Sequence, residues 1–150
     1  MSWRRVVDVT LSEDVAAPPA RVRDFYVDLD NMAVVHPLVV SVRTVARADT
    51  ADGYMQTYRV VDRITLGRLR FRILYVAKLQ VPASGDVIAE ARQFPGVRLR
   101  TVVTFGESPV GTRIVERMHI CAPRPLAGVT CRQAENAHAE MLANIRRHFA

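Results

Sequence analysis

Glu116 is the carboxylate whose sequence neighbours most favour a chemical role. Ile114 and Met118 flank it at two-residue spacing, whereas Arg113 and Arg117 occupy the alternate positions. On a strand this alternation puts Glu116 on the apolar face. A carboxylate buried without a partner has a raised pKa and can act as a general acid or base in a cyclisation or dehydration. The alternative is a pair with an arginine of a neighbouring strand near the rim of the sheet.

Two tyrosines, Tyr58 and Tyr75, lie on consecutive predicted strands. A two-residue loop at Leu66 and Gly67 would set the two tyrosines opposite each other on an apolar face. Buried tyrosine hydroxyls need partners, so they could orient a ligand oxygen, or bond each other or water. The other face of this strand pair is basic and carries Arg59, Arg63, Arg68, Arg70, Arg72 and Lys78.

His36 precedes Pro37 at a predicted helix end, where it could cap backbone carbonyls or point into the mouth of a cavity. No Ser/His/Asp arrangement or phosphate-cradling glycine loop is present. Cys121 and Cys131 are ten residues apart and have no CxxC motif beside them. We therefore expect neither a metal nor a cofactor, and we interpret the cysteines as small apolar residues.

Turn signals divide the chain into elements that could position these side chains. Hairpin-length loops predict an antiparallel sheet, so the fold class is α+β with seven curved strands, two short helices after the first strand and a long C-terminal helix. The predicted strands are 3–15, 38–48, 54–65, 68–81, 87–94, 97–106 and 112–122. The first helix begins at Pro18-Pro19, and the second runs from Met32 to Val35 behind an Asp30 or Asn31 cap.

The turn at Pro95-Gly96 decides where the charges of Glu90 and Arg92 point. A two-residue loop would place both side chains inside, with Leu99. A one-residue bulge would send them outward and bring in the alanines of the same strand instead. The bulge is favoured, because two interior charges would need compensation.

The terminal segment from about Leu126 has apolar residues at helical spacing, and its length suffices to cross a curved sheet. It carries small residues, Ala134 and Ala137, where large ones would fill the space beneath the helix. A cavity between helix and sheet is therefore one interpretation, and a filled core is the other.

The 150 residues suit one domain, and the 49% apolar content suits a real core. No run of 18 apolar residues is present, and acidic and polar residues interrupt the start, so we expect a cytoplasmic location. The net charge of +6 is the balance of 21 basic residues, of which 20 are arginines and one is Lys78, against 15 acidic residues. It predicts at most weak contact with anionic membranes and no specific nucleic-acid site, since no aromatic-interleaved basic strip is present.

The order of elements resembles the START-like helix-grip (Bet v 1, or SRPBCC) superfamily over essentially the whole chain. Local motifs support this: Val15-Ala16-Ala17-Pro18 before the first helix, His36-Pro37-Leu38-Val39 after the second, Gly111-Thr112-Arg113-Ile114 opening the last strand, and a proline-rich entry to the terminal helix. Within the superfamily the chain is similar to bacterial polyketide cyclase/dehydrase-type and lipid-transport-like proteins.

The resemblance implies that a small hydrophobic or aromatic molecule, lipid-like or polyketide-like, binds between the sheet and the terminal helix. The alternative is a polyketide cyclase or dehydratase that uses acid/base residues in that cavity. The sequence favours binding slightly, because spacing secures no acid/base pair. The expected ligand-binding residues are Phe25, His36, Tyr54, Tyr58, Val60, Phe71, Ile73, Tyr75, Leu99, Thr101, Val103, Glu116, Met118, Ala134, His138 and Met141. Glu116 is the one catalytic candidate.

Overall fold

A computed structural model describes residues 3–150 of the chain. In that part, the elements follow the predicted order. The strands are β1 (Arg4–Val15), β2 (Val39–Thr50), β3 (Gly53–Leu66), β4 (Leu69–Pro82), β5 (Val87–Gln93), β6 (Val97–Ser108) and β7 (Gly111–Pro123). The helices are α1 (Pro19–Val27), α2 (Leu29–Val35) and α3 (Arg124–His148).

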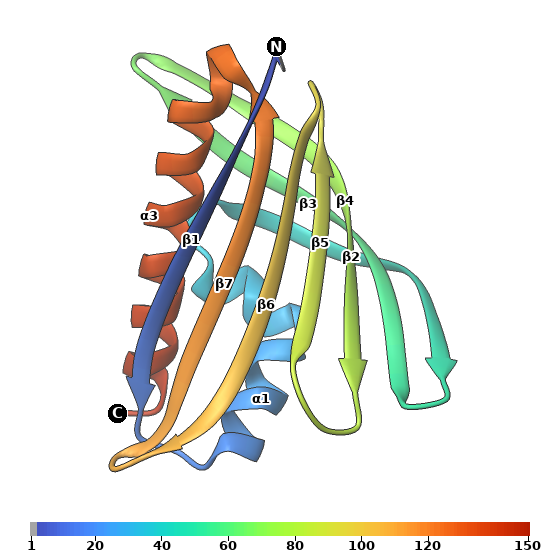
Figure 1. Cartoon of the computed structure of the whole chain (residues 1–150), viewed down its shortest axis with the longest axis vertical. Coiled ribbons are helices and arrows are strands. Elements are labelled where there is room, and N and C mark those ends of the chain that lie inside the picture. Colours follow the sequence, from blue (N-terminus) through green and yellow to red (C-terminus); the bar gives the residue numbers. More distant parts are fainter. Residues whose placement is uncertain (1–2) are drawn as a thin grey trace.

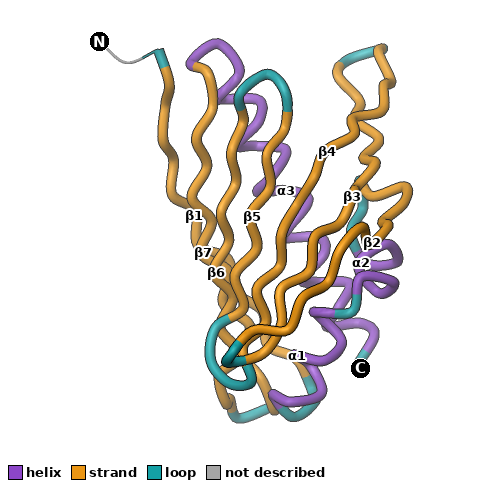
Figure 2. Tube along the Cα trace, turned by 90° about the vertical axis from the view of Figure 1, so that its right-hand side faces the viewer, coloured by secondary structure: helices purple, strands orange, loops and turns teal. Residues whose placement is uncertain are grey.

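The seven strands form one antiparallel sheet in the order β1-β7-β6-β5-β4-β3-β2. Consecutive hairpins account for β2 to β7, and β1 adds to the free edge of β7 (Figure 1). The sheet curves, and α3 lies along one of its faces, with α1 and α2 near the end of α3 that carries the C-terminus (Figure 2). This arrangement confirms the predicted helix-grip fold.

The pairing of β3 with β4 differs from the prediction by two residues. The turn is formed by Gly67 and Arg68, so Tyr58 faces Ala77, and Tyr75 faces Val60. The predicted Tyr58–Tyr75 pair is therefore wrong. A shift by two residues preserves the strand alternation, so both tyrosines still lie on the inner face of the sheet. The left-handed backbone of Gly67 explains the shift, because glycine adopts a positive φ without steric cost.

The turn between β5 and β6 follows the bulge interpretation. Gln93 pairs with Val97, which leaves a three-residue loop instead of a two-residue one. Glu90 therefore faces outward, where its carboxylate lies 3.4 Å from the Arg100 guanidinium on the adjacent strand. The inner face receives small residues at this point, including Ala91 opposite Leu99.

The second short helix begins earlier than predicted. Its cap is Asp28, whose carboxylate accepts a hydrogen bond from the Asp30 backbone N–H at 3.0 Å, so neither Asp30 nor Asn31 caps it. The terminal helix also begins earlier, at Arg124, since Pro125 fits the first helical turn without loss of a hydrogen bond.

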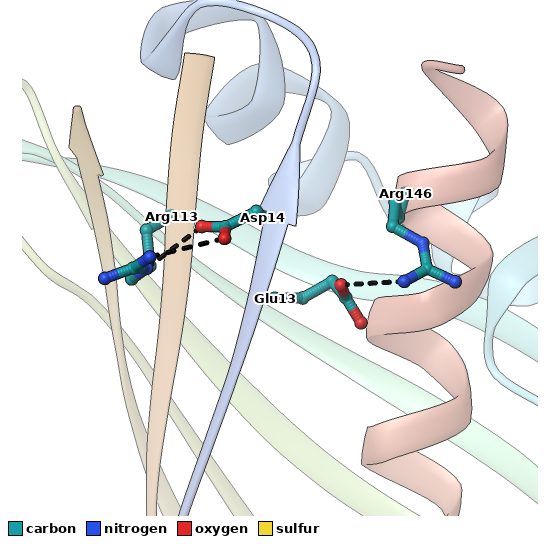
Figure 3. Close-up of polar contacts among 4 residues, drawn as sticks. All are labelled: Glu13, Asp14, Arg113 and Arg146. Carbon is teal, nitrogen blue, oxygen red and sulfur yellow. Dashed lines mark hydrogen bonds and ion pairs between the residues drawn. The ribbon is translucent and has the colours of Figure 1, made fainter. Parts of the chain in front are cut away.

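Two ion pairs join edge strand β1 to helix α3 and to strand β7 (Figure 3). Glu13 Oε1 lies 3.2 Å from Arg146 Nη1 of α3, and Asp14 Oδ1 lies 2.9 Å from Arg113 Nε of β7. The first pair joins β1 to the C-terminal half of α3, whose Ile145 packs in the main core, and the second joins β1 to β7. Within residues 3–150, no helix has the length and apolarity needed to cross a membrane.

Candidate functional site

A cavity of about 510 Å³ lies between the N-terminal half of α3 and the inner face of the sheet. Strands β3 to β7 form its wall, and the segment after α2 closes one side. Its apolar lining includes Ile64, Phe71, Ile73, Leu74, Ala91, Val97, Leu99, Ile120, Leu126, Val129, Ala134 and Ala137. Polar residues of the lining include His36, Asp62, Tyr75, Gln93, Thr130, Gln133 and His138, and Arg72 borders the cavity from a position that alternates onto the outer face of β4.

Glu116 lies on the inner face of β7 and is completely buried. Its Oε2 accepts a hydrogen bond from the Tyr26 hydroxyl of α1, and its Oε1 lies 3.0 Å from His138 Nδ1 of α3. Interior placement therefore follows the strand alternation, but pairing with an arginine is wrong. The arginines of β7 alternate onto the other face and do not reach Glu116. A tyrosine of α1 and a histidine of α3 satisfy its carboxylate oxygens instead.

His138 has contacts on both sides of its ring. Burial by itself lowers its pKa, but the charge and hydrogen bond of Glu116, with a further contribution from the Asp62 charge, raise the pKa above 6.5. Nδ1 faces a carboxylate oxygen, which is an acceptor, so Nδ1 donates to Glu116. The His138 side chain is 14% exposed and lines the cavity, where its raised pKa favours the charged form of the ring.

Asp62 of β3 is a second buried carboxylate, and unlike Glu116 it lines the larger cavity. Only 6% of the residue is exposed, and no residue of the described part of the chain, 3–150, hydrogen-bonds to its buried Oδ1. Burial raises its pKa from 3.8 to about 6, against smaller lowering effects from hydrogen bonding with Tyr75 and from the charge of His138. An unpaired buried carboxylate oxygen is costly, and such groups concentrate at functional sites.

His36 and Tyr75 complete the polar end of the cavity. The rings of His36 and His138 meet edge to face with centroids 5.5 Å apart. The His36 side chain fixes the chain after α2, because its Nδ1 accepts a hydrogen bond from the Leu38 backbone N–H at 3.2 Å, and the backbone N–H of His36 caps the helix by donating to the Met32 carbonyl. Burial, together with the charge of His138, lowers the pKa of His36 to about 3. Burial, followed by the charge of Asp62, raises the pKa of Tyr75 well above 10.

A smaller cavity of about 70 Å³ continues from this polar end toward α1 and α2. Five residues line both spaces: His36, Tyr75, Ala91, Leu99 and His138. Burial raises the pKa of Tyr58, which lines the smaller space, to about 12. Ten of the expected ligand-binding residues thus line one space or the other: His36, Tyr58, Val60, Phe71, Ile73, Tyr75, Leu99, Thr101, Ala134 and His138.

Six expected ligand-binding residues line neither space. Phe25 stacks on His148 and Phe149 at the end of α3, and Tyr54 lies beneath the Arg47 guanidinium. The other four are buried: Val103, Glu116, Met118 and Met141. They point inward as expected, but neighbouring side chains fill the space around them. Glu116 reaches the cavity only through His138.

Sequence reasoning missed Asp62 and did not place Gln93, Thr130 and Gln133 at the cavity. The sequence did contain a signal for Asp62: it is two residues from both Val60 and Ile64, so the strand alternation places it on the inner face with them. Among the described residues, 3–150, no three histidine, cysteine, aspartate or glutamate side chains gather in a way that could hold a metal ion. Both cysteines there are free thiols.

Several solved structures share this fold across nearly the whole chain. A Thermus thermophilus protein, TTHA0849, has a TM-score of 0.75 at 17% identity, with 94% of this chain and 95% of that chain covered. The Zhui aromatase/cyclase from a Streptomyces species has a TM-score of 0.70 at 14% identity, with 98% and 96% covered. A START superfamily protein from Mycobacterium smegmatis has a TM-score of 0.69 at 16% identity, with 97% and 99% covered.

At these identities the structural likeness establishes the fold alone. No curated protein sequence matches the chain. The sequence profile of one family, polyketide cyclase / dehydrase and lipid transport, matches residues 6–150. That span includes β7, α3 and all the cavity-lining residues named above. The chain therefore belongs to the polyketide cyclase/dehydrase and lipid transport family.

Proposed function

We propose that this protein binds a small, mainly apolar or aromatic molecule in the cavity beneath the N-terminal half of α3. The observation that carries the proposal is the composition of the cavity wall. Aliphatic and aromatic side chains form most of it, and a few polar groups gather around His138. Such sites obtain affinity from apolar burial, at about 25 cal/mol per Å² removed from water, and orientation from the few polar contacts.

The packing of the two halves of α3 supports the same function. Its C-terminal half packs Met141, Leu142 and Ile145 into the core, which fixes the helix against the sheet. Its N-terminal half presents Ala134 and Ala137 to the cavity. One rigid helix therefore closes the fold at one end and leaves space at the other, so the cavity is largely pre-formed.

A second candidate function, acid/base catalysis of a cyclisation or dehydration, has one supporting observation. The Glu116 carboxylate orients the His138 ring, and the ring lines the cavity together with Asp62. An oriented imidazole beside a carboxylate with a pKa of about 6 can transfer protons near neutral pH. Binding is the better supported function, because it requires only the cavity and does not depend on the position of a reacting atom.

Titration with the neutral fluorescent probe N-phenyl-1-naphthylamine tests the binding function. The parent protein should enhance the fluorescence of the probe in a saturable manner. Ala137→Leu should weaken binding at least about tenfold while the melting temperature falls little, because the added atoms enter empty space. Ala139→Leu is the matched control, since Ala139 is exposed on the same helix, and it should leave binding unchanged.

The same titration separates a cavity from a packed interior. If the parent does not enhance the probe fluorescence, and Ala137→Leu lowers stability by about 1–3 kcal/mol as overpacking does, the space is closed in solution and the proposal is wrong.

A further inference from the structure

Asp62 occupies a position that the fold alone does not explain. It lies in the middle of β3, between the buried side chains of Val60 and Ile64 on the inner face. The adjacent arginines, Arg59 and Arg63, are exposed and alternate onto the opposite face, so neither neutralises it. An apolar residue at this position would continue the core pattern without the desolvation cost of a carboxylate.

The neighbours of Asp62 account for only part of its hydrogen-bonding capacity. Hydrogen bonding with Tyr75 and the charge of His138 both lower the pKa of the carboxylate. Among residues 3–150 the buried Oδ1 atom has no hydrogen-bond partner, although an ionised carboxylate offers about four acceptor sites. Because Asp62 lines the larger cavity, a molecule bound there is the group best placed to supply the missing donor.

The charges around this oxygen restrict the chemistry of the donor. A ligand carboxylate or phosphate would face Asp62, with the buried Glu116 close behind His138. An ammonium group would approach His138, whose pKa the charges of Glu116 and Asp62 raise toward the positively charged form. A neutral hydroxyl brings no charge toward either group, and it donates its hydrogen to Asp62.

We infer that the molecule bound in this cavity carries a neutral hydroxyl group, alcoholic or phenolic, that donates a hydrogen bond to Asp62. Its apolar body then extends between Ile73 and Leu99 on the sheet and Ala134 on α3. The inference rests on the proposed binding function and adds the polar group by which the ligand is recognised. A site built to pair a hydroxyl discriminates against an analogue that lacks it, because its own buried acceptor is left unpaired.

A matched pair of small aromatic probes tests this inference. 2-Naphthol carries a phenolic hydroxyl, and 2-methoxynaphthalene replaces its hydrogen by a methyl group, so the second probe cannot donate. Calorimetric titration at neutral pH, where Asp62 is mainly ionised, should give at least about tenfold tighter binding of 2-naphthol.

Two variants assign this preference to Asp62. In Asp62→Leu the two probes should bind within about twofold of each other. In Gln93→Leu, which removes a polar side chain from another strand of the same cavity, the preference should remain. The melting temperature of each variant shows whether it is folded, and Asp62→Leu should melt no lower than the parent, because it removes a buried charge.

The outcomes separate the inference from the function on which it rests. Equal binding of both probes to the parent would overturn the hydroxyl inference and leave cavity binding intact. A preference for 2-naphthol that survives in Asp62→Leu would also overturn it, because another acceptor would then be responsible. If the parent binds neither probe, both the inference and the binding function are wrong.

Discussion

Glu116 Oε1 and His138 Nδ1 lie 3.0 Å apart and join the middle of β7 to the middle of α3 beneath the cavity. The carboxylate is completely buried, and the Tyr26 hydroxyl of α1 occupies its other oxygen. One side chain thus connects the sheet with two helices, and it fixes the orientation of the ring that faces the ligand space. The pair therefore links the stability of the fold to the geometry of the site.

Loss of the histidine in this pair should destabilise the fold strongly. His138→Leu leaves the Glu116 carboxylate buried with Tyr26 as its remaining partner, and breaking a buried pair costs about 3–5 kcal/mol. Urea denaturation measures this loss. His119→Leu is the control, because His119 lies 2.7 Å from Asp8 in an exposed pair that contributes at most about 1 kcal/mol. Similar decreases in the free energy of unfolding of the two variants would contradict a large stabilising contribution from the buried Glu116–His138 pair.

Asp62 should lower stability at neutral pH. Its pKa is raised from 3.8 to about 6 in the folded state, so the folded protein binds the proton more tightly than the unfolded chain does. The contribution of Asp62 to the free energy of unfolding therefore falls as the pH rises from about 4 to about 6. Asp62→Asn should raise that free energy at neutral pH by up to about 3 kcal/mol, with little gain near pH 4.

The difference between Asp62→Asn and the parent isolates this effect. His36 titrates over an overlapping range with the opposite sign, because its folded pKa of about 3 lies below 6.5, but it is present in both proteins. Of the other groups around Asp62, Tyr75 has its pKa raised well above 10 and titrates outside this window. The charge of Asp62 helps to raise the pKa of His138 above 6.5, so the titration of His138 at higher pH also changes with the substitution, and the range from pH 4 to about 6 reports Asp62. A stability difference that is constant between pH 4 and neutrality would contradict a raised pKa for Asp62.

The outer face of the β3–β4 hairpin should bind anionic surfaces weakly. Arg59, Arg63, Arg68, Arg70 and Arg72 are exposed there. Each basic residue near an anionic bilayer contributes about 1 kcal/mol to the free energy of membrane binding. At physiological ionic strength, salt screens exposed charges from each other beyond about 8 Å. Co-sedimentation with phosphatidylserine vesicles should therefore be detectable at low salt and absent at high salt. Binding that persists at high salt would require a specific lipid site on this face.

The spacing of apolar residues, with a period of two in strands and 3.6 in helices, was enough to predict most of the fold. The alternation in β3, β4 and β7 predicted which side chains point inward, and the helical spacing after Leu126 predicted α3. Alternation is insensitive to a shift of two residues, which is why the pairing of Tyr58 with Tyr75 was wrong while the face was right. The β5–β6 register was predictable because only one of its two alternatives kept Glu90 outside.

The site was less predictable than the fold, since its contacts join residues that are far apart in the sequence. Tyr26 and Glu116 are 90 positions apart, and no local pattern shows that α1 reaches β7. The partner of Glu116 on α3 also depends on the rotation of that helix over the sheet. Asp62 was different, because its alternation with Val60 and Ile64 indicated an inward carboxylate from the sequence alone.

The most direct test of the binding function is to locate a bound probe by isotope-edited nuclear Overhauser measurements between 2-naphthol and the methyl groups of the protein. Ala134, Ala137 and Leu99 line the larger cavity from two sides, so their methyl protons should show contacts to the aromatic protons of the probe. The exposed methyl group of Ala139 should show none. Contacts confined to exposed methyl groups such as Leu69 on the β3–β4 hairpin, with none to the cavity residues, would contradict binding between α3 and the sheet.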